Sequence, residues 1–213
     1  MRIPGIDTCI ALMEQYAMLP NICQHSFIVA RIAELLAFRL QESVPSGQAP
    51  DQDFCVTGAL LHDIAKTPCL KEDCDHAATG AEICRRHGYP EIAEVVGGHV
   101  ILHNFSPEKY SQGMFHARDI VYYADKRVRH DSIVSLAERL EYILERYGGN
   151  DERVQELIQD NFKKCEQLEG YLFRFLNFSP EQLRSKVEEH SSQSSLAEGS
   201  FETLLAEQDT VRN

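Results

Sequence analysis

Two adjacent residues, His62 and Asp63, stand where an apolar helix should continue. The helical stripe through Val56 and Leu60 reaches Asp63, and a carboxylate buried there costs several kcal/mol unless a cation meets it. Lys66 follows Asp63 on the same helical face. A histidine, a carboxylate and an ammonium group on one stripe favour a metal site with a phosphate above it. The alternative is a helix end that merely exposes the pair.

Two other helical stripes carry a metal-type ligand in place of an apolar residue. The upstream stripe holds His25 and the downstream stripe holds Asp125; their apolar members are Ile22, Val29, Ile32 and Leu36, and Val121, Ala124 and Val128. A lone buried histidine is more often a hydrogen-bonded core residue than a ligand. The metal prediction therefore depends on the three stripes together.

The order His25, His62-Asp63, Asp125 resembles that of the HD superfamily of metal-dependent phosphohydrolases, which is named for this pattern. The words His62–Lys66 and Ala124–Val128 are similar to its usual forms, including the HDIG type, and the resemblance covers about residues 20 to 147. It implies an all-α HD-domain helical bundle. It also implies hydrolysis of a phosphoester or phosphoanhydride bond of a nucleotide-type substrate by a metal-activated hydroxide.

Two further histidines match the six-ligand, binuclear subset of that superfamily. His76 follows the His-Asp pair after a short loop, and His99 ends the next helix. The resemblance then implies a full set of metal ligands: His25, His62, Asp63, His76, His99 and Asp125, with Asp63 bridging. Iron or manganese is favoured over zinc, cobalt, nickel or magnesium. With one metal, His76 and His99 would be ordinary helix-end residues. His103, four residues after His99, could also reach the site or replace His99 as a ligand.

The cations near these ligands are candidates for binding phosphate. Lys66 is expected to act with Asp63 in catalysis. Lys66, Lys126 and Arg129 are expected to contact the substrate phosphate, because charge-assisted hydrogen bonds to phosphate are strong. Arg118 is expected on a solvated face. The sequence contains no glycine-rich phosphate loop and no serine-hydrolase elbow. Two other classes stay open, an HD-fold di-iron oxygenase and a non-catalytic nucleotide sensor.

The composition is that of a globular protein with an acidic surface. The chain has 213 residues, 43% hydrophobic and 25% charged, and a net charge of −12, which disfavours nucleic acids and anionic membranes as partners. A small phosphorylated molecule, bound through local cations, is the expected partner. The seven cysteines are odd in number and no secretory segment precedes them, so we expect reduced thiols and a cytoplasmic protein. The pair Cys69 and Cys74 fits no zinc motif.

The remaining chain supplies the elements that must position these groups. We expect helices at 6–18, 22–41, 51–63, 76–87, 90–98, 117–129 and 133–147. Asn21, Asp51 and the acidic residues before His76 are expected to cap three of them. A loop is expected at 104–114, and no strands are expected. The HD domain is expected at 1–149 and a C-terminal helical extension at 150–213, with a flexible linker near 191–200. The apolar segment 171–176 should be buried, against the domain or in a homodimer. His116, His130 and His190 are expected at the surface or behind the ligands.

Overall fold

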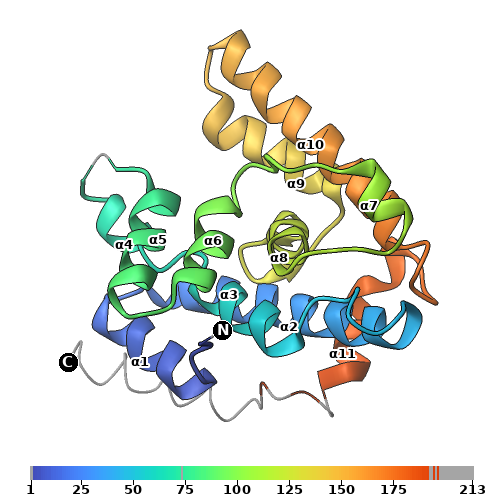
Figure 1. The fold of residues 1–213 in the computed structure, drawn as a ribbon. Coiled ribbons are helices and arrows are strands. Elements are labelled where there is room, and N and C mark those ends of the chain that lie inside the picture. The colour runs from blue at the N-terminus through green and yellow to red at the C-terminus, as the bar shows by residue number, and fades with distance from the viewer. Residues whose placement is uncertain (1, 73, 192–193, 195, 197–213) are drawn as a thin grey trace.

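The computed structural model describes residues 2–72, 74–191, 194 and 196. Helices surround one central helix, α8, which is seen end-on in Figure 1. In chain order they are α1 (Ile6–Gln15), α2 (Pro20–Ser43), α3 (Gln52–Leu61), α4 (Lys66–Cys69), α5 (His76–Arg86), α6 (Pro90–Gly98), α7 (Pro107–Ser111), α8 (Ala117–Lys126), α9 (Leu136–Ile143), the π-helix η1 (Leu144–Gly148), α10 (Glu152–Leu172), the 3-10 helix η2 (Pro180–Gln182) and α11 (Leu183–His190). The all-α prediction is confirmed. Within the described residues, no helix combines the length and the apolar character needed to cross a membrane.

One small hairpin interrupts the helical pattern. β1 (Val128–Arg129) pairs antiparallel with β2 (Ser132–Ile133), so the expectation that no strand would form was wrong at this place. The helix that carries Asp125 accordingly ends at Lys126 instead of Arg129. His130 occupies the left-handed region at φ 54°, which lets the chain reverse.

The long helix α2 forms the floor on which α3, α8 and α11 pack. Its predicted cap was wrong: the helix begins at Pro20, which suits a first helical position, and Asn21 lies inside the first turn. The cap of α3 was correctly predicted, because Asp51 accepts a hydrogen bond from the backbone N–H of Phe54 at 2.8 Å. The N-terminal part of α2 and the C-terminal end of α3 lie close together, so that His25 and His62 meet.

The helices α5 and α6 form a closely packed pair beside α3, at the left of Figure 1. Asp75 caps α5 by accepting the N–H groups of Ala77 and Ala78, as the sequence suggested. Gly80 of α5 allows the close approach, because a Cβ built there would lie 2.9 Å from Cγ1 of Val96. This packing sets His76 and His99 side by side.

The α8 helix runs through the middle of the molecule and contacts α2, α3, α6 and α10. All of its residues except Arg118 are buried. The loop expected at 104–114 contains the short helix α7, whose Tyr110 donates a hydrogen bond from its hydroxyl to Asp119 at 3.0 Å. This contact fixes the start of α8, where Asp119 also accepts the N–H of His116 at 2.9 Å.

The helices α9 and α10 form the arm that rises at the top of Figure 1. The inner end of α10 is anchored by buried residues such as Phe162 and Leu168, and the apolar segment 171–176 packs on the core as expected. Ser179 precedes the 3-10 helix η2, where Pro180 takes the first position and the side chain of Gln182 accepts the N–H of Ser179 at 2.9 Å. The domain boundary predicted at residue 149 stays a prediction. The described residues do not include most of the linker predicted at 191–200 or the rest of the C-terminus.

Candidate metal centre

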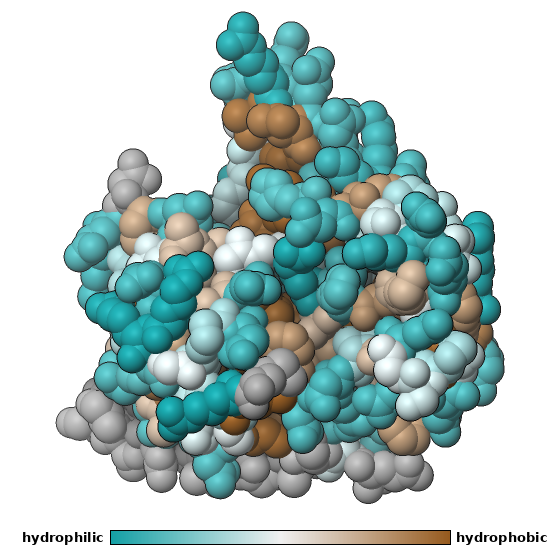
Figure 2. Space-filling view, in the orientation of Figure 1, coloured by the Kyte–Doolittle hydropathy of each residue, from teal (hydrophilic) through white to brown (hydrophobic). Residues whose placement is uncertain are grey.

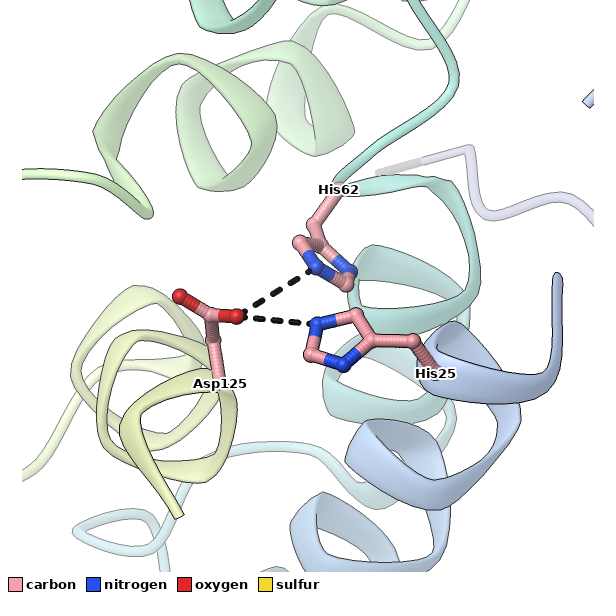
Figure 3. Close-up of side chains that lie close together, drawn as sticks. All are labelled: His25, His62 and Asp125. Atoms are coloured by element: carbon pink, nitrogen blue, oxygen red, sulfur yellow. Dashed lines mark hydrogen bonds and ion pairs between the residues drawn. The ribbon is translucent and has the colours of Figure 1, made fainter. Parts of the chain in front are cut away.

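Three buried side chains from distant parts of the chain meet at the base of the site (Figure 3). His25 comes from α2, His62 follows α3, and Asp125 lies on α8. Nε2 of His25 lies 3.0 Å from Oδ1 of Asp125, and Nε2 of His62 lies 3.8 Å from the same oxygen. Three ligand-type atoms therefore converge on one point, which is the arrangement that a transition-metal ion requires.

Asp63 lies between this group and a second pair of histidines. Its Oδ2 lies 3.4 Å from Nε2 of His62 and 4.0 Å from Nε2 of His25. Its Oδ1 lies 3.5 Å from Nε2 of His76 and 3.6 Å from Nε2 of His99. The six residues singled out in the sequence are thus brought together, and the carboxylate of Asp63 turns one oxygen toward each histidine pair.

Backbone hydrogen bonds orient two of the imidazoles. Nδ1 of His62 lies 2.6 Å from the carbonyl oxygen of Ala59, and Nδ1 of His99 lies 2.6 Å from that of Val96. Because a carbonyl oxygen can only accept, each Nδ1 carries the hydrogen, and in a neutral ring Nε2 then offers the lone pair. Both Nε2 atoms face the cluster, as metal ligands must.

Two buried polar atoms of the cluster support a fit to metal ions. Within the described part of the chain, Nε2 of His62 and Oδ1 of Asp63 have no hydrogen-bond partner. A buried polar atom without a partner costs about 1–3 kcal/mol, so such atoms are rare unless they serve a ligand. The donor set of nitrogen and carboxylate oxygen suits iron, manganese, zinc, cobalt or nickel.

The protonation states of the ligands also fit metal binding. Burial opposes ionisation of Asp63, but the neighbouring His62 and Lys66 outweigh it and hold the pKa of this carboxyl well below its usual range. Burial likewise opposes ionisation of Asp125, yet Lys126 and His25 keep its pKa well below the usual range. Burial lowers the pKa of His76 to about 4, so its ring is neutral near pH 7.

The residues of this centre fall inside one family match. The model of the HD domain matches residues 22–143, which is more than half of the chain. The chain belongs to the HD domain family. The match runs from the start of α2 through α9 and so includes all six ligand-type residues of this HD domain.

Curated relatives share this region at low identity. Ribonuclease Y of Treponema denticola is 31% identical over 134 residues, which is 61% of this chain and 24% of that protein. Ribonuclease Y of Frankia alni is 30% identical over 124 residues, 58% of this chain and 16% of that protein. The chain thus matches only a quarter or less of the length of these relatives. The comparison with solved structures gave no match.

Three cations contact the acidic ligands of the HD centre. Nζ of Lys66 donates to Oδ2 of Asp63 at 2.7 Å, and Nζ of Lys126 donates to Oδ2 of Asp125 at 2.7 Å. The third is Arg139 of α9, whose Nη2 lies 3.7 Å from Oδ1 of Asp125 and which sequence reasoning missed. The sequence did contain a signal for Arg139, because it replaces an apolar residue in the helical stripe that includes Leu136 and Ile143. Asp63 replaces an apolar residue in another stripe in the same way.

Arg129, the third predicted phosphate contact, packs against an aromatic ring beside the centre. It is exposed, its guanidinium carbon lies 5.0 Å from the ring centroid of Tyr142, and it lines a polar hollow of about 700 Å³ beside the centre. Lys66, Arg139 and Arg146 line the same hollow. The cations therefore surround one side of the HD centre.

The sequence prediction for His190 is wrong, and the alternative role of His103 is not supported. His103 is exposed and lines a separate hollow, outside the cluster. His190 is buried against Phe38 instead of lying at the surface, because α11 packs on α2. His116 and His130 are exposed, as expected.

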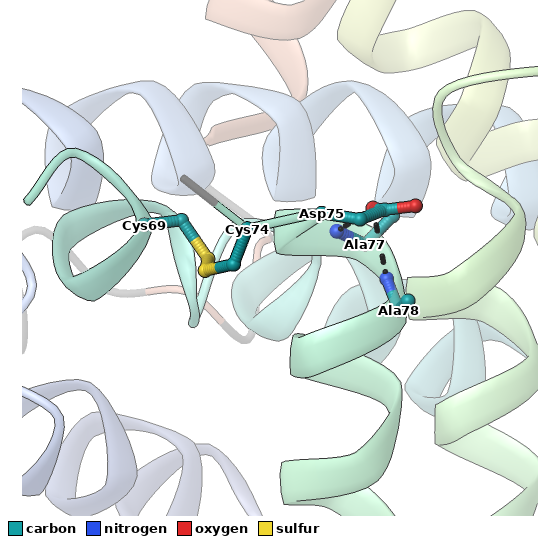
Figure 4. Close-up of a disulfide and its surroundings, with 5 residues drawn as sticks. All are labelled: Cys69, Cys74, Asp75, Ala77 and Ala78. Carbon is teal, nitrogen blue, oxygen red and sulfur yellow. Dashed lines mark hydrogen bonds between the residues drawn. A yellow bond between two sulfur atoms is a disulfide. The ribbon is translucent and has the colours of Figure 1, made fainter. Parts of the chain in front are cut away.

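The prediction that all cysteines are reduced was also wrong. Cys69 and Cys74 form a disulfide that closes the loop between α4 and α5 (Figure 4). The chain reverses here within a few residues, and the two Cα atoms come within 5.1 Å, a distance that a disulfide can bridge. This loop joins Lys66 to His76, so the disulfide lies at the rim of the centre. The other five cysteines are buried thiols outside this disulfide.

Proposed function

We propose that this HD domain is a metal-dependent phosphohydrolase with two divalent ions. The observation that carries the proposal is the position of Asp63, which faces His25 and His62 with one oxygen and His76 and His99 with the other. His25, His62 and Asp125 would hold one ion, His76 and His99 the other, and Asp63 would bridge them. The resemblance to the HD superfamily favours iron or manganese in this proposal, and the nitrogen and carboxylate donors would also suit zinc, cobalt or nickel, with magnesium as a further alternative.

Divalent ions at such a site act as Lewis acids and lower the pKa of water toward neutrality, which removes the need for a protein nucleophile. The chain itself fixes the ligand rings through Ala59 and Val96 and keeps Asp63 ionised. Lys66 extends from the rim of the centre, where its side chain is 32% exposed, so it can reach a substrate oxygen. Lys126 is more buried and sustains the charge balance around Asp125.

A phosphorylated small molecule is the substrate class that we propose. The protein carries a net charge of −12, yet Lys66, Arg129, Arg139 and Arg146 line the polar hollow beside the centre. Local cations against an acidic background attract a compact anion more than a long polyanion. A nucleotide is the class predicted from the sequence. An RNA substrate, which the name of the ribonuclease Y relatives suggests, is the alternative that a direct test must include.

The first experiment measures metal content and phosphate release together. Protein loaded anaerobically with iron or manganese should hold close to two ions and release phosphate or nucleotide from members of a panel of mononucleotides, dinucleoside polyphosphates and cyclic dinucleotides. A short oligoribonucleotide tests the alternative. Oxygen consumption without hydrolysis would instead identify a di-iron oxygenase, and tight nucleotide binding without turnover would identify a sensor.

The second experiment separates one metal from two. The variant His76→Ala/His99→Ala should fall from two ions toward one while its circular dichroism spectrum stays that of the folded protein. His103→Ala is the matched control, because this exposed histidine lies outside the cluster. One ion in the wild type, unchanged in the double variant with full activity, would refute the binuclear assignment.

The location of the protein remains a proposal as well. We keep the cytoplasm as the proposed compartment because five cysteines are buried thiols outside the disulfide. The Cys69–Cys74 disulfide argues for more oxidising conditions. Thiol titration of protein purified under alkylating conditions would show which state the cell maintains.

A further inference from the structure

A second hollow beside the centre is lined by exposed apolar side chains. The large hydrophobic residues exposed in the described part of the chain are Leu70 (65%), Ile101 (46%), Tyr147 (56%) and Leu157 (70%). All four line this hollow, which has a volume of about 420 Å³. Single exposed hydrophobic residues are ordinary, but their convergence on one concavity marks a binding site.

These side chains come from segments far apart in the sequence. Leu70 follows α4, Ile101 follows α6, Tyr147 lies on η1 and Leu157 lies on α10. The walls continue with aliphatic residues of the α9–α10 arm: Ile143, Val154 and Ile158. Figure 2 shows apolar side chains gathered along this arm below its polar tip. We call this hollow the aliphatic cleft.

One end of the aliphatic cleft opens on the metal centre. Asp63, His76, His99 and Asp125 line that end, together with the cations Lys66, Lys126 and Arg139. The polar hollow that contains Arg129 adjoins the cleft, and the two share Asp63, Lys66, Leu70, Arg139 and Tyr147. A molecule bound at the centre would therefore meet cations around its phosphate and apolar side chains along the rest of its length.

The amide of Asn161, a polar group in the wall of the cleft, is already occupied. Its Nδ2 donates to the carbonyl oxygen of Val100 at 2.9 Å, and its Oδ1 accepts from the hydroxyl of Tyr122 at 3.0 Å. The walls include the aromatic rings of Tyr147 and Phe162, but a nucleobase placed against these apolar side chains would leave its donors and acceptors without partners, which is unfavourable. An alkyl chain has no such groups and gains from burial.

We propose that the aliphatic cleft binds the apolar alcohol of a phosphate monoester, with the phosphate held at the metal ligands. This inference rests on the proposed function and names its substrate class. In the reaction, the oxygen of water bonds to phosphorus as the bond from phosphorus to the alcohol oxygen breaks. The alcohol takes a proton and leaves, and inorganic phosphate remains. The charge complementarity of the phosphate with Lys66 and Arg139 sets the orientation.

Chain length is the variable that tests this proposal. For the metal-loaded full chain, kcat/KM for phosphate release should rise roughly fourfold for each buried methylene, and so on the order of 10²-fold from ethyl to hexyl phosphate. Hexylphosphonate, which cannot be hydrolysed in this way, should bind more tightly than ethylphosphonate by a similar factor in calorimetry. The second measurement reports on the cleft even without turnover.

A charge placed in the cleft should remove the preference. Leu157→Asp alters a side chain that is 70% exposed, so folding should be preserved, and the ratio of hexyl to ethyl activity should fall at least tenfold. Gln159→Asp on the same helix is exposed and lies outside the lining, so it should leave the ratio unchanged.

Four outcomes separate this inference from the proposed function. Ethyl phosphate hydrolysis without dependence on chain length would overturn the inference and leave the hydrolase assignment. Chain-length-dependent binding without any phosphate release would support the cleft and overturn the hydrolase. Faster hydrolysis of nucleotides than of hexyl phosphate, unaffected by Leu157→Asp, would overturn the apolar alcohol. A dimer that Leu157→Asp dissociates, with the chain-length ratio unchanged, would show that the cleft is an interface instead.

Discussion

A single added methyl group at Gly58 should disturb the metal centre from a distance. Gly58 of α3 packs against Val95 of α6, and each residue lies one helical turn before a ligand, His62 and His99 respectively. The two imidazole centroids are 4.9 Å apart. The contact between the glycine and the valine therefore sets the spacing of the two rings.

The size of the effect follows from the contact distance. A Cβ at Gly58 would lie 2.8 Å from Cγ1 and 3.3 Å from Cβ of Val95. Carbon atoms prefer a separation of about 3.5 Å or more, so the contact is short by about 0.7 Å. Valine is stiff at χ1 and cannot easily turn away. Overpacking of this kind costs about 1–3 kcal/mol.

Helix propensity acts in the opposite direction and needs a control. Alanine is favoured over glycine inside a helix by about 1 kcal/mol. Gly170 of α10 provides the control, because a Cβ there would meet no atom within 4 Å. We therefore expect Gly58→Ala to be about 1–3 kcal/mol less stable toward urea than Gly170→Ala.

The assay measures unfolding free energy, metal content and turnover of the same preparations. Gly58→Ala should lose turnover by about tenfold to a hundredfold, because a misplacement of about 1 Å has effects of that size. The double variant Gly58→Ala/Val95→Ala removes the opposing methyl groups and should recover metal content and much of the turnover. Full stability and turnover in the single variant would refute the idea that this contact sets the ligand spacing.

Three other predictions concern the surroundings of the centre. Lys66→Ala should lower turnover by on the order of 10²-fold with unchanged metal content, because a donor that stabilises negative charge on the substrate is lost. Equal turnover of the variant and the wild type would show that Lys66 does not contact the substrate. Replacing Cys69 and Cys74 by serine should lower the free energy of unfolding by up to about 2 kcal/mol, the loop-closure contribution of so short a loop, and reducing agent should then have no further effect in denaturation experiments. Burial raises the pKa of Asp119 above its usual 3.8, so the folded protein binds this proton more tightly than the unfolded chain does. The free energy of unfolding should therefore fall as pH rises from 3.8 through the raised pKa, and Asp119→Asn should lack this fall. A difference in urea stability between the two proteins that does not change with pH would contradict the reasoning.

Part of the clustered set could be predicted from the sequence because some of its members break a local pattern, whereas His76 and His99 were predicted from the resemblance to the HD superfamily. His25, Asp63 and Asp125 replace apolar residues in helical stripes, and such a replacement is visible without any knowledge of tertiary contacts. The caps at Asp51 and Asp75 are local in the same sense. Whether Asp51 and Asp75 cap a helix depends only on the neighbouring backbone N–H groups, so the two cap predictions were correct.

Features that depend on distant contacts could not be read in this way. The disulfide requires that the chain after α4 reverse within a few residues, which no spacing rule reveals. His190 is buried only because α11 packs on α2. The contribution of α10 to the aliphatic cleft depends on how the arm folds back over the centre. Arg139 is different, since its place in an apolar stripe was a local signal that went unused.

The enclosure of α8 has a consequence for local fluctuations of the protein. Every residue of this helix except Arg118 is buried, so a local opening of one side of the helix would not expose its amide hydrogens to solvent. Their exchange with deuterium should therefore follow only global unfolding, whereas the amides of the short helices α4 and α7 should exchange through small local openings. Asp125 then lies on the slowest-exchanging segment and Lys66 on one of the fastest. The entrance of the centre can open and close many times during the lifetime of the ligand framework beneath it.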